Sequence, residues 1–259
     1  FHMSLEGTDL DKLALSTEKL LAGTDSKITT IGYYCNPIQY AEHRKTLENV
    51  ICTAGKFGAT HVSTFAGAWE GKPVESAYEE FGKVFRELAD LAEEKGVKLG
   101  IENCLMDGTW EHATCNIGFN PKAWEVMFEE VKNDNFGLEW EPTHQMVQLI
   151  DPVTELRKWC KKIVHIHGKD ATIDWDAVRH SGISGAVPFV WHRMPGFGDT
   201  NWRDIISILR SNGYEDDICI EGYHDPVYSG ELEMTGQLHA LNYLKWCRGG
   251  DFTPTPWAK

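Results

Sequence analysis

Short apolar runs alternate along the chain with longer segments in which apolar residues recur at helical spacing. Apolar or alternating runs of about four to eight residues are typical of strands, whereas recurrence at i, i+3, i+4 and i+7 is typical of amphipathic helices. This pattern predicts strands at residues 28–34, 60–65, 97–101, 136–140, 163–167 and 218–221. It predicts helices at residues 9–22, 40–57, 73–95, 121–132, 151–160, 202–211 and 230–246. Strands that alternate with helices indicate βαβ units and a parallel sheet.

The length and the glycine pattern narrow the fold class within the α/β proteins. A chain of 259 residues matches the roughly 250 residues of a (β/α)8 TIM barrel. No predicted strand is followed by GxGxxG or GxxxxGK[ST], the glycine-rich signatures of nucleotide-binding sheets. We therefore expect one TIM barrel domain over residues 1–259, with loop-like stretches at 103–120 and 171–199 and an irregular C-terminal tail at about 248–259.

The balance of charges and the cysteines restrict the class of partner and the compartment. The chain has 39 Asp and Glu against 25 Lys and Arg, a formal net charge of −14, and an acidic protein repels nucleic-acid phosphates. It has no apolar run of about 18 residues that could span a membrane, and its first residues lack the basic and apolar regions of a signal peptide. Seven cysteines without a CxxC pair indicate reduced thiols. We expect a cytoplasmic protein that binds neither nucleic acid nor membranes.

Ligand-type side chains stand at the ends of four successive predicted strands: Glu102, Glu141, His167 and Glu221. The carboxyl ends of barrel strands surround the active site. Three carboxylates and an imidazole that converged there would repel one another unless a divalent cation neutralised them. Oxygen and nitrogen ligands favour Mn²⁺, Mg²⁺ or Co²⁺ over thiolate-preferring ions. The alternative, that each glutamate is a solvated loop residue, explains one strand end better than it explains four.

Two neighbouring residues compete for these roles. His165 and His167 are two positions apart, so their side chains lie on the same face of the strand, with His165 deeper as a packing residue or a partner of a ligand. Glu139 likewise faces the same way as Glu141 and lies deeper. The sequence alone leaves open which member of each pair binds the metal.

Five segments resemble those of the xylose isomerase-like TIM barrels, a superfamily that includes sugar phosphate isomerases and epimerases, ketose 3-epimerases and endonuclease IV. They are IENC, LEWEPTH, HIHGKD, RMPGFGDTNW and CIEG, and the resemblance spans about residues 28–246. It implies a metal held by Glu102, Glu141, His167 and Glu221, with Mn²⁺ as the expected ion and Mg²⁺, Co²⁺ or Zn²⁺ as alternatives. Glu141 stands where the family usually has an aspartate, which adds a methylene to that ligand.

The resemblance also implies a reaction, namely proton abstraction next to a carbonyl through an enediolate that the metal stabilises, as in metal-dependent sugar isomerases and epimerases. Glu102 and Glu221 would exchange protons on opposite faces of the substrate, with His144 as a further acid or base. Arg193 and Lys169 would contact substrate oxygens, although Lys169 suits a structural ion pair nearly as well. The implied partner is a small-molecule sugar or sugar derivative, and the family also forms homo-oligomers.

Three other functions remain open on the same residues. A metal-dependent lyase acting on 3-keto-glycosides would begin with the same proton abstraction, with His144 as the base. The aromatic region that would receive its aryl group comprises Trp110, Phe119, Trp191, His192 and Phe197, with Trp110 and His192 as substrate contacts. An endonuclease IV-type nuclease needs histidines that residues 33–36 and 64–67 lack, and the net charge opposes it. A non-enzymatic sugar-binding barrel would keep the pocket and bind no metal.

The family motifs align the six predicted strands with the last six of eight barrel strands. A barrel that lacked two strands would expose two edges and an open core. We therefore expect that the first one or two strands lie outside residues 1–259 and that the natural chain is longer. Eight barrel strands within these residues would contradict this expectation.

Overall fold

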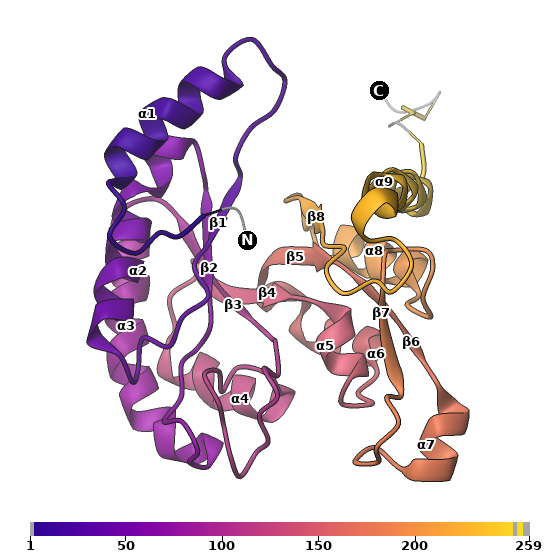
Figure 1. Ribbon diagram of the computed structural model, residues 1–259. Coiled ribbons are helices and arrows are strands. Elements are labelled where there is room, and N and C mark those ends of the chain that lie inside the picture. The colour runs from indigo at the N-terminus through magenta and orange to yellow at the C-terminus, as the bar shows by residue number, and fades with distance from the viewer. Residues whose placement is uncertain (1–2, 251–252, 256–259) are drawn as a thin grey trace. The chain divides into compact units, whose positions relative to one another are not determined.

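The computed structural model describes residues 3–250 and 253–255 (Figure 1). Contacts divide the chain into two compact units. The first unit comprises the described residues of Phe1–Gln145 and Lys162–Ile166, and the second unit comprises those of Met146–Lys161 and His167–Lys259. Of the irregular tail predicted at about 248–259, residues 251–252 and 256–259 lie outside the described part of the chain.

A parallel sheet forms the centre of the first unit, with the strand order β1-β2-β3-β4-β5. Its strands are β1 (Thr30–Gly32), β2 (His61–Thr64), β3 (Lys98–Glu102), β4 (Phe136–Trp140) and β5 (Ile163–Gly168), whose last two residues belong to the second unit. The register places Glu102 opposite Glu139, and Glu139 opposite His165. Polar side chains of three neighbouring strands therefore stand at one level of the sheet.

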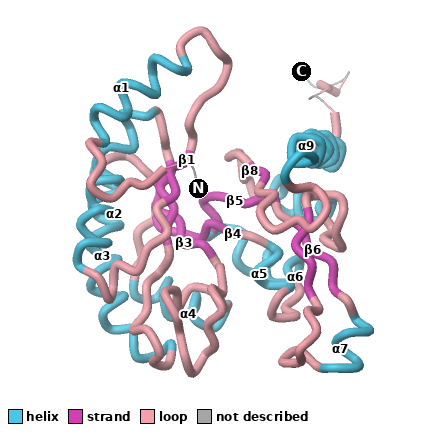
Figure 2. Tube along the Cα trace, in the orientation of Figure 1, coloured by secondary structure: helices cyan, strands magenta, loops and turns pink. Residues whose placement is uncertain are grey.

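Helices α1, α2 and α3 lie side by side along one side of this sheet (Figure 1, Figure 2). The helices of the unit are α1 (Leu10–Leu21), α2 (Ala41–Thr53), α3 (Tyr78–Glu94), α4 (Pro121–Glu130) and the short α5 (Pro142–Met146), whose last residue belongs to the second unit, with 3-10 turns at Ala54–Phe57 and Val74–Ala77. Asp9 caps α1 by accepting from the Lys12 N–H at 3.0 Å. Phe81 and Phe85 on the apolar face of α3 stack at 4.6 Å between ring centroids and pack against Phe136 of β4. All three rings are buried, so this contact attaches α3 to the sheet.

The second unit combines helices, an antiparallel hairpin and strand β8. Its elements are α6 (Pro152–Trp159), β6 (Asp170–Ile173), α7 (Trp175–Ser181), β7 (Val190–Arg193), α8 (Trp202–Ser211), β8 (Ile218–Ile220) and α9 (Glu233–Arg248), with 3-10 turns at Gly230–Leu232 and at Cys160–Lys162, whose last residue belongs to the first unit. The Glu221 N–H donates to the Gly168 carbonyl at 3.1 Å, so the chain after β8 lies beside the end of β5. β6 and β7 pair with Asp170 opposite Arg193, and α7 lies at the far end of this hairpin (Figure 1).

The six predicted strands are all present and differ from the prediction only at their ends, which confirms the α/β class. The prediction of a loop over residues 171–199 is wrong, because β6, α7 and β7 occupy about half of it. The hairpin was missed because its two strands have only four residues each and are partly buried, and because Pro188 interrupts the apolar run that leads into β7. With the hairpin, the described residues contain eight strands, of which β6 and β7 form a separate two-stranded sheet. None of the helices in the described ranges is long and apolar enough to cross a bilayer.

Candidate functional site

Three predicted site residues of the first unit lie together where β3 and β4 end. Glu102 is the last residue of β3, Glu141 directly follows β4, and His144 lies in α5. His144 Nε2 is 3.3 Å from Glu141 Oε1. The three residues are buried, with exposed fractions of 7%, 0% and 8% respectively. Charges interact more strongly when they are buried than when they are in water. A cation or a proton that bound here would therefore interact strongly with both carboxylates.

Cys104 belongs to the same cluster, although it was not among the residues predicted for the site. One ligand atom from each of Glu102, Cys104 and His144 lies within 4.8 Å of the other two. Its position two residues after Glu102 was the available signal, because side chains at this spacing share a face of an extended chain. A cysteine outside a CxxC pair did not by itself indicate a metal site.

Two buried asparagines hold the ends of β3 and β4 in place. Asn103 Nδ2 donates to the Glu141 carbonyl at 2.9 Å, and Asn103 Oδ1 accepts from the Glu141 N–H at 2.7 Å. Asn116 Nδ2 donates to the carbonyls of Glu102 and Cys104 at 2.9 and 2.8 Å. Both asparagines are fully buried, so losing either would leave backbone groups unsatisfied away from water. The two carboxylates are therefore carried by a preorganised backbone.

A second polar group of the first unit surrounds Glu139, one pleat before Glu141. Tyr34 donates its hydroxyl to Glu139 Oε2 at 2.8 Å, and His165 Nε2 lies 3.9 Å from Glu139 Oε1. Thr30 Oγ1 is 3.4 Å from His165 Nδ1. Glu139 and His165 are both buried. These contacts support the interpretation of Glu139 and His165 as partners that lie behind the candidate ligands.

In the second unit, the carboxylate of Glu221 lies between two nitrogen-bearing side chains. His167 Nδ1 is 3.1 Å from Glu221 Oε2, and Lys169 Nζ is 2.7 Å from Glu221 Oε1. The Lys169 side chain is only 3% exposed, whereas that of Glu221 is 28% exposed. Lys169 therefore forms a structural ion pair, one of the two roles that its sequence position allowed, and its partner is Glu221. The ion pair orients Glu221 next to His167.

Arg193, at the end of β7, has Asp225 as its partner. Arg193 Nε is 3.5 Å from Asp225 Oδ2. Asp225 also accepts from the Met194 N–H at 2.7 Å and from the N–H groups of Val227 and Tyr228, both at 2.8 Å. Burial acts to raise the pKa of Asp225, but the three N–H donors and Arg193 together outweigh it and lower that pKa below its usual value. Asp225 thus anchors the strand end that carries Arg193.

Asp170, the first residue of β6, organises the glycine-rich turn that follows β7. Its Oδ1 accepts from the N–H groups of Ala171 and Thr200 at 2.8 and 2.9 Å, and its Oδ2 accepts from the Gly196 N–H at 3.2 Å. Burial raises the pKa of Asp170, although these hydrogen bonds act in the opposite direction. A Cβ on Gly198 would lie 2.3 Å from Asp170 Oδ1. The turn therefore depends on both the carboxylate and the missing side chain.

Trp110 and His192, the two predicted aromatic substrate contacts, each have ring or hydrogen-bond partners inside their own unit. Trp110 Nε1 donates to Glu75 Oε1, and its ring meets Phe119 edge-on at 6.5 Å. The His192 ring meets that of His224 at 5.5 Å. These contacts fix the orientation of the two rings.

Phe197 of the predicted aromatic region packs inside a stack of rings in the second unit. Its ring lies 4.2 Å from that of Tyr228 and 3.9 Å from that of His239, nearly parallel to both. The Arg193 guanidinium lies 5.8 Å from the centre of the same ring. Phe197 therefore supports Arg193 and its turn by packing.

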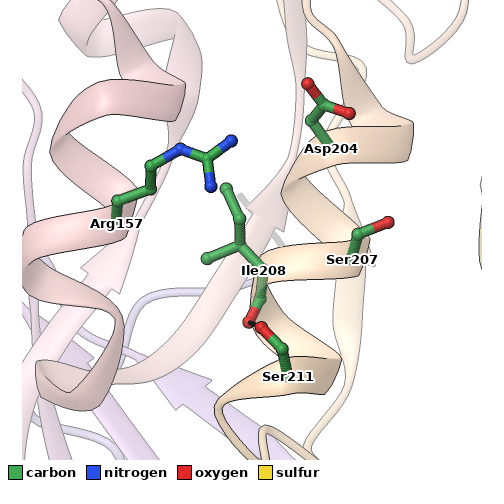
Figure 3. Close-up of a pocket in the computed structure, with 5 residues that line it drawn as sticks. All are labelled: Arg157, Asp204, Ser207, Ile208 and Ser211. Carbon is green, nitrogen blue, oxygen red and sulfur yellow. Dashed lines mark hydrogen bonds between the residues drawn. The ribbon is translucent and has the colours of Figure 1, made fainter.

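A separate surface hollow of about 170 Å³ lies between α6 and α8 of the second unit (Figure 3). Its lining residues are Arg157 of α6 and Asp204, Ser207, Ile208 and Ser211 of α8. Arg157 extends toward Ile208, and Ser211 Oγ donates to the Ile208 carbonyl at 2.9 Å (Figure 3). None of these lining residues is a predicted site residue. We therefore interpret this hollow as a groove between two packed helices.

The side chains of both units fit a divalent cation by the chemistry of their donors. In the first unit, Glu102 and Glu141 supply buried carboxylates, and the imidazole of His144 lies 3.3 Å from the second of these. In the second unit, Glu221 and His167 supply a carboxylate and an imidazole 3.1 Å apart. Carboxylate oxygen and imidazole nitrogen are ligands for Mn²⁺, Co²⁺ and Zn²⁺. Buried carboxylates are also costly without a compensating positive charge.

The chain is similar in sequence to a family of known proteins. Residues 4–245 match the family described as the xylose isomerase-like TIM barrel. An inosose dehydratase of Clostridium tetani is 26% identical over 182 residues, which cover 68% of this chain and 57% of that protein. The chain thus spans little more than half the length of this curated relative.

Two solved structures share the fold over most of the chain. D-psicose 3-epimerase in the presence of D-fructose has a TM-score of 0.69 at 16% identity and covers 95% of this chain and 86% of its own. The 3-keto-D-glucoside 4-epimerase YcjR from E. coli, in its apo form, has a TM-score of 0.67 at 13% identity, with coverages of 91% and 85%. Identities this low show the fold alone, and they confirm a TIM-barrel-like α/β architecture. With the match over residues 4–245, the chain belongs to the xylose isomerase-like TIM barrel family.

Proposed function

We propose that the protein is a metal-dependent sugar isomerase or epimerase in which Glu102, Glu141, His167 and Glu221 hold one divalent cation. The observation that carries the proposal is the setting of Glu221, whose two oxygens lie 3.1 Å from His167 and 2.7 Å from Lys169. The Lys169 ammonium compensates the negative charge on this carboxylate and fixes its direction, as a metal ligand requires. Family membership supports the same assignment, because D-psicose 3-epimerase shares the fold.

Mn²⁺ is the expected ion, with Mg²⁺, Co²⁺ and Zn²⁺ as alternatives. Three carboxylates and one imidazole form a ligand set dominated by hard oxygen donors. When bound, the cation supplies Lewis-acid polarisation of a carbonyl and stabilises the negative charge that develops on its oxygen.

Glu102 and Glu221 are the proposed proton-transferring groups. One carboxylate removes the proton from the carbon next to the carbonyl, and the other returns a proton at the same or the adjacent carbon. His144, 3.3 Å from Glu141 Oε1, is placed to move a proton to or from a substrate oxygen. Arg193, held by Asp225, provides a directed cation for sugar hydroxyls. The burial of Glu102 and His144 limits the access of bulk water to these two side chains.

A metal-dependent lyase is the second candidate function, and one relative in the sequence comparison supports it. The relative matched over 182 residues is named an inosose dehydratase, and a dehydration can begin with the same abstraction of a proton next to a carbonyl. The step that differs is the departure of a hydroxyl group or, in a 3-keto-glycoside, of the aglycone. His144 would then protonate the leaving oxygen.

A substrate panel separates these candidates. The metal-free protein is reloaded with Mn²⁺ and assayed on free ketoses, on inosose and on 3-keto-glucosides, in deuterated water. Formation of an isomeric sugar that carries solvent deuterium supports the isomerase or epimerase. Loss of water or of an aglycone supports the lyase. Sugar binding without turnover and without metal would instead identify a non-enzymatic binding barrel.

Glu221→Gln is the variant that tests the proposed mechanism, because it keeps the shape of the side chain and removes its charge. We expect it to lower kcat by about 10²-fold or more and to weaken metal binding. Glu79→Gln is the control, because Glu79 lies on α3 with its side chain 85% exposed, paired with Lys83. Undiminished turnover of Glu221→Gln, or turnover by protein stripped of metal, would contradict the mechanism.

A further inference from the structure

The cluster of Glu102, Cys104 and His144 in the first unit combines three different kinds of metal ligand. A carboxylate oxygen, a sulfur and an imidazole nitrogen lie within 4.8 Å of one another. Glu102 and His144 are buried, and Cys104 is half-buried. The chemistry proposed above assigns no role to the sulfur, so its place among two candidate ligands needs an explanation.

A single side chain holds the backbone that carries the sulfur and the carboxylate. Asn116 Nδ2 donates to the carbonyls of Glu102 and Cys104 at 2.9 and 2.8 Å. Asn116 Oδ1 accepts from the N–H groups of Ala66 and Gly118 at 3.0 and 2.9 Å. These four hydrogen bonds fix the backbone spacing of the two ligand-bearing residues. Ligands oriented before binding lose less conformational entropy when a cation arrives.

We propose that Glu102, Cys104 and His144 form a thiolate-containing cation subsite that prefers Zn²⁺ or Co²⁺ to Mn²⁺ or Mg²⁺. The inference rests on the proposed function, because Glu102 belongs to both ligand sets. A thiolate is a soft ligand and raises the affinity of a site for borderline-soft ions. Binding replaces the sulfur–hydrogen bond of Cys104 with a sulfur–metal bond and releases that proton to solvent.

Titration of the full-length, metal-free protein with Co²⁺ tests the subsite. Cobalt bonded to a thiolate absorbs strongly in the near ultraviolet through sulfur-to-metal charge transfer, whereas cobalt held by oxygen and nitrogen alone does not. We expect this band in the wild type and its loss in Cys104→Ser. The same variant should bind Zn²⁺ about tenfold more weakly while its affinity for Mn²⁺ changes much less.

Cys115→Ser is the matched control. Cys115 is half-buried in the same stretch of chain, and burial raises the pKa of its thiol, but it is not a member of the cluster. This variant should keep the charge-transfer band. Glu221→Gln should also keep it, because the subsite is built from residues of the first unit.

The outcomes separate the subsite from the proposed function. A wild-type cobalt complex without the band, or a band that survives in Cys104→Ser, overturns the subsite, and sugar turnover by the same preparation then still supports the proposed function. A band in a protein that turns over no sugar supports the subsite and contradicts the proposed function. If Cys104→Ser does not fold, X-ray absorption of the zinc-loaded wild type decides the question, because a zinc–sulfur distance of about 2.3 Å supports the subsite and its absence overturns it.

Discussion

Asn103 links the two carboxylates of the first unit through the backbone. It lies directly after Glu102, and its amide makes two hydrogen bonds, at 2.9 and 2.7 Å, with the backbone of Glu141, which is 38 residues away. An uncharged residue thus sets the separation of the two strand ends from which charged ligands extend. Positioning of this kind affects metal affinity and stability together.

We expect Asn103→Ala to lower the free energy of unfolding by about 2 kcal/mol, because the N–H and the carbonyl of Glu141 would be left buried without their partner. Metal affinity should fall in the same variant. Urea unfolding and metal titration measure the two effects. Asn133→Ala is the control, because the Asn133 side chain donates to the exposed carboxylates of Asp90 and Glu93. Equal stability of the two variants would show that the Asn103 bonds do not hold the strand ends.

Asp225 should make stability depend on pH in a defined direction. Its pKa is lowered in the folded state, relative to about 3.9 in an unfolded chain. Ionised Asp225 therefore stabilises the fold above about pH 4, and this contribution is lost as the pH falls through the folded-state pKa. Asp225→Asn should be destabilised by about 1–2 kcal/mol at neutral pH, and by less in acid.

Urea unfolding at pH 7 and near pH 3 measures this difference for Asp225→Asn against the wild type. Asp176→Asn serves as the comparison, because the Asp176 side chain is 94% exposed and pairs only with Arg179 in the second unit. A destabilisation by Asp225→Asn that is the same at both pH values would mean that the charge of Asp225 does not contribute.

At the scale of elements, strands β4 and β5 approach each other where β4 has a glycine. A Cβ on Gly137 would lie 2.3 Å from the Lys162 carbonyl oxygen and 2.7 Å from Val164 Cγ1. The absence of a side chain at this point therefore lets Val164 pack across the sheet. Close packing of this kind leaves no space for an added methyl group.

Gly137→Ala should lower the free energy of unfolding by about 1–3 kcal/mol, the usual cost of overpacking. Gly55→Ala is the control, because a Cβ there meets no described atom within 4 Å, and the substitution should be neutral or slightly stabilising. Thermal unfolding of both variants measures the difference. A Gly137→Ala protein as stable as the Gly55→Ala protein would show that β4 and β5 can separate at no cost.

For the whole molecule, the proposal predicts that metal binding and folding are coupled. Mn²⁺ at about 100 times its Kd should raise the free energy of unfolding by about 2.7 kcal/mol. If one cation is shared by the ligands of both units, Glu102→Gln and Glu221→Gln should each remove most of this stabilisation, and the double variant should lose little more. Thermal unfolding with and without Mn²⁺ measures all four proteins. Additive losses would indicate that each unit binds its own cation.

The sequence predicted best those elements whose side chains are uniformly buried or strictly amphipathic. β4 and α8 lie at the predicted residues, because one is a fully buried strand of mostly apolar residues and the other buries residues at i, i+3 and i+4. The β6–β7 hairpin is partly exposed, and α5, with five residues, is too short to show a helical period. The periodicity of apolar residues therefore could not predict either the hairpin or α5.

The sequence by itself determined which residues end the strands, and hence that Glu102, Glu141, His167 and Glu221 were candidates for one kind of chemistry. This follows because strand ends depend on neighbours in the chain. Only the tertiary structure decided the partners: Lys169 with Glu221, Arg193 with Asp225, and Cys104 within reach of His144. Such pairs join residues tens of positions apart. Hydrogen bonds and ion pairs depend on distances of a few ångströms, and local patterns of apolar and polar residues do not encode those distances.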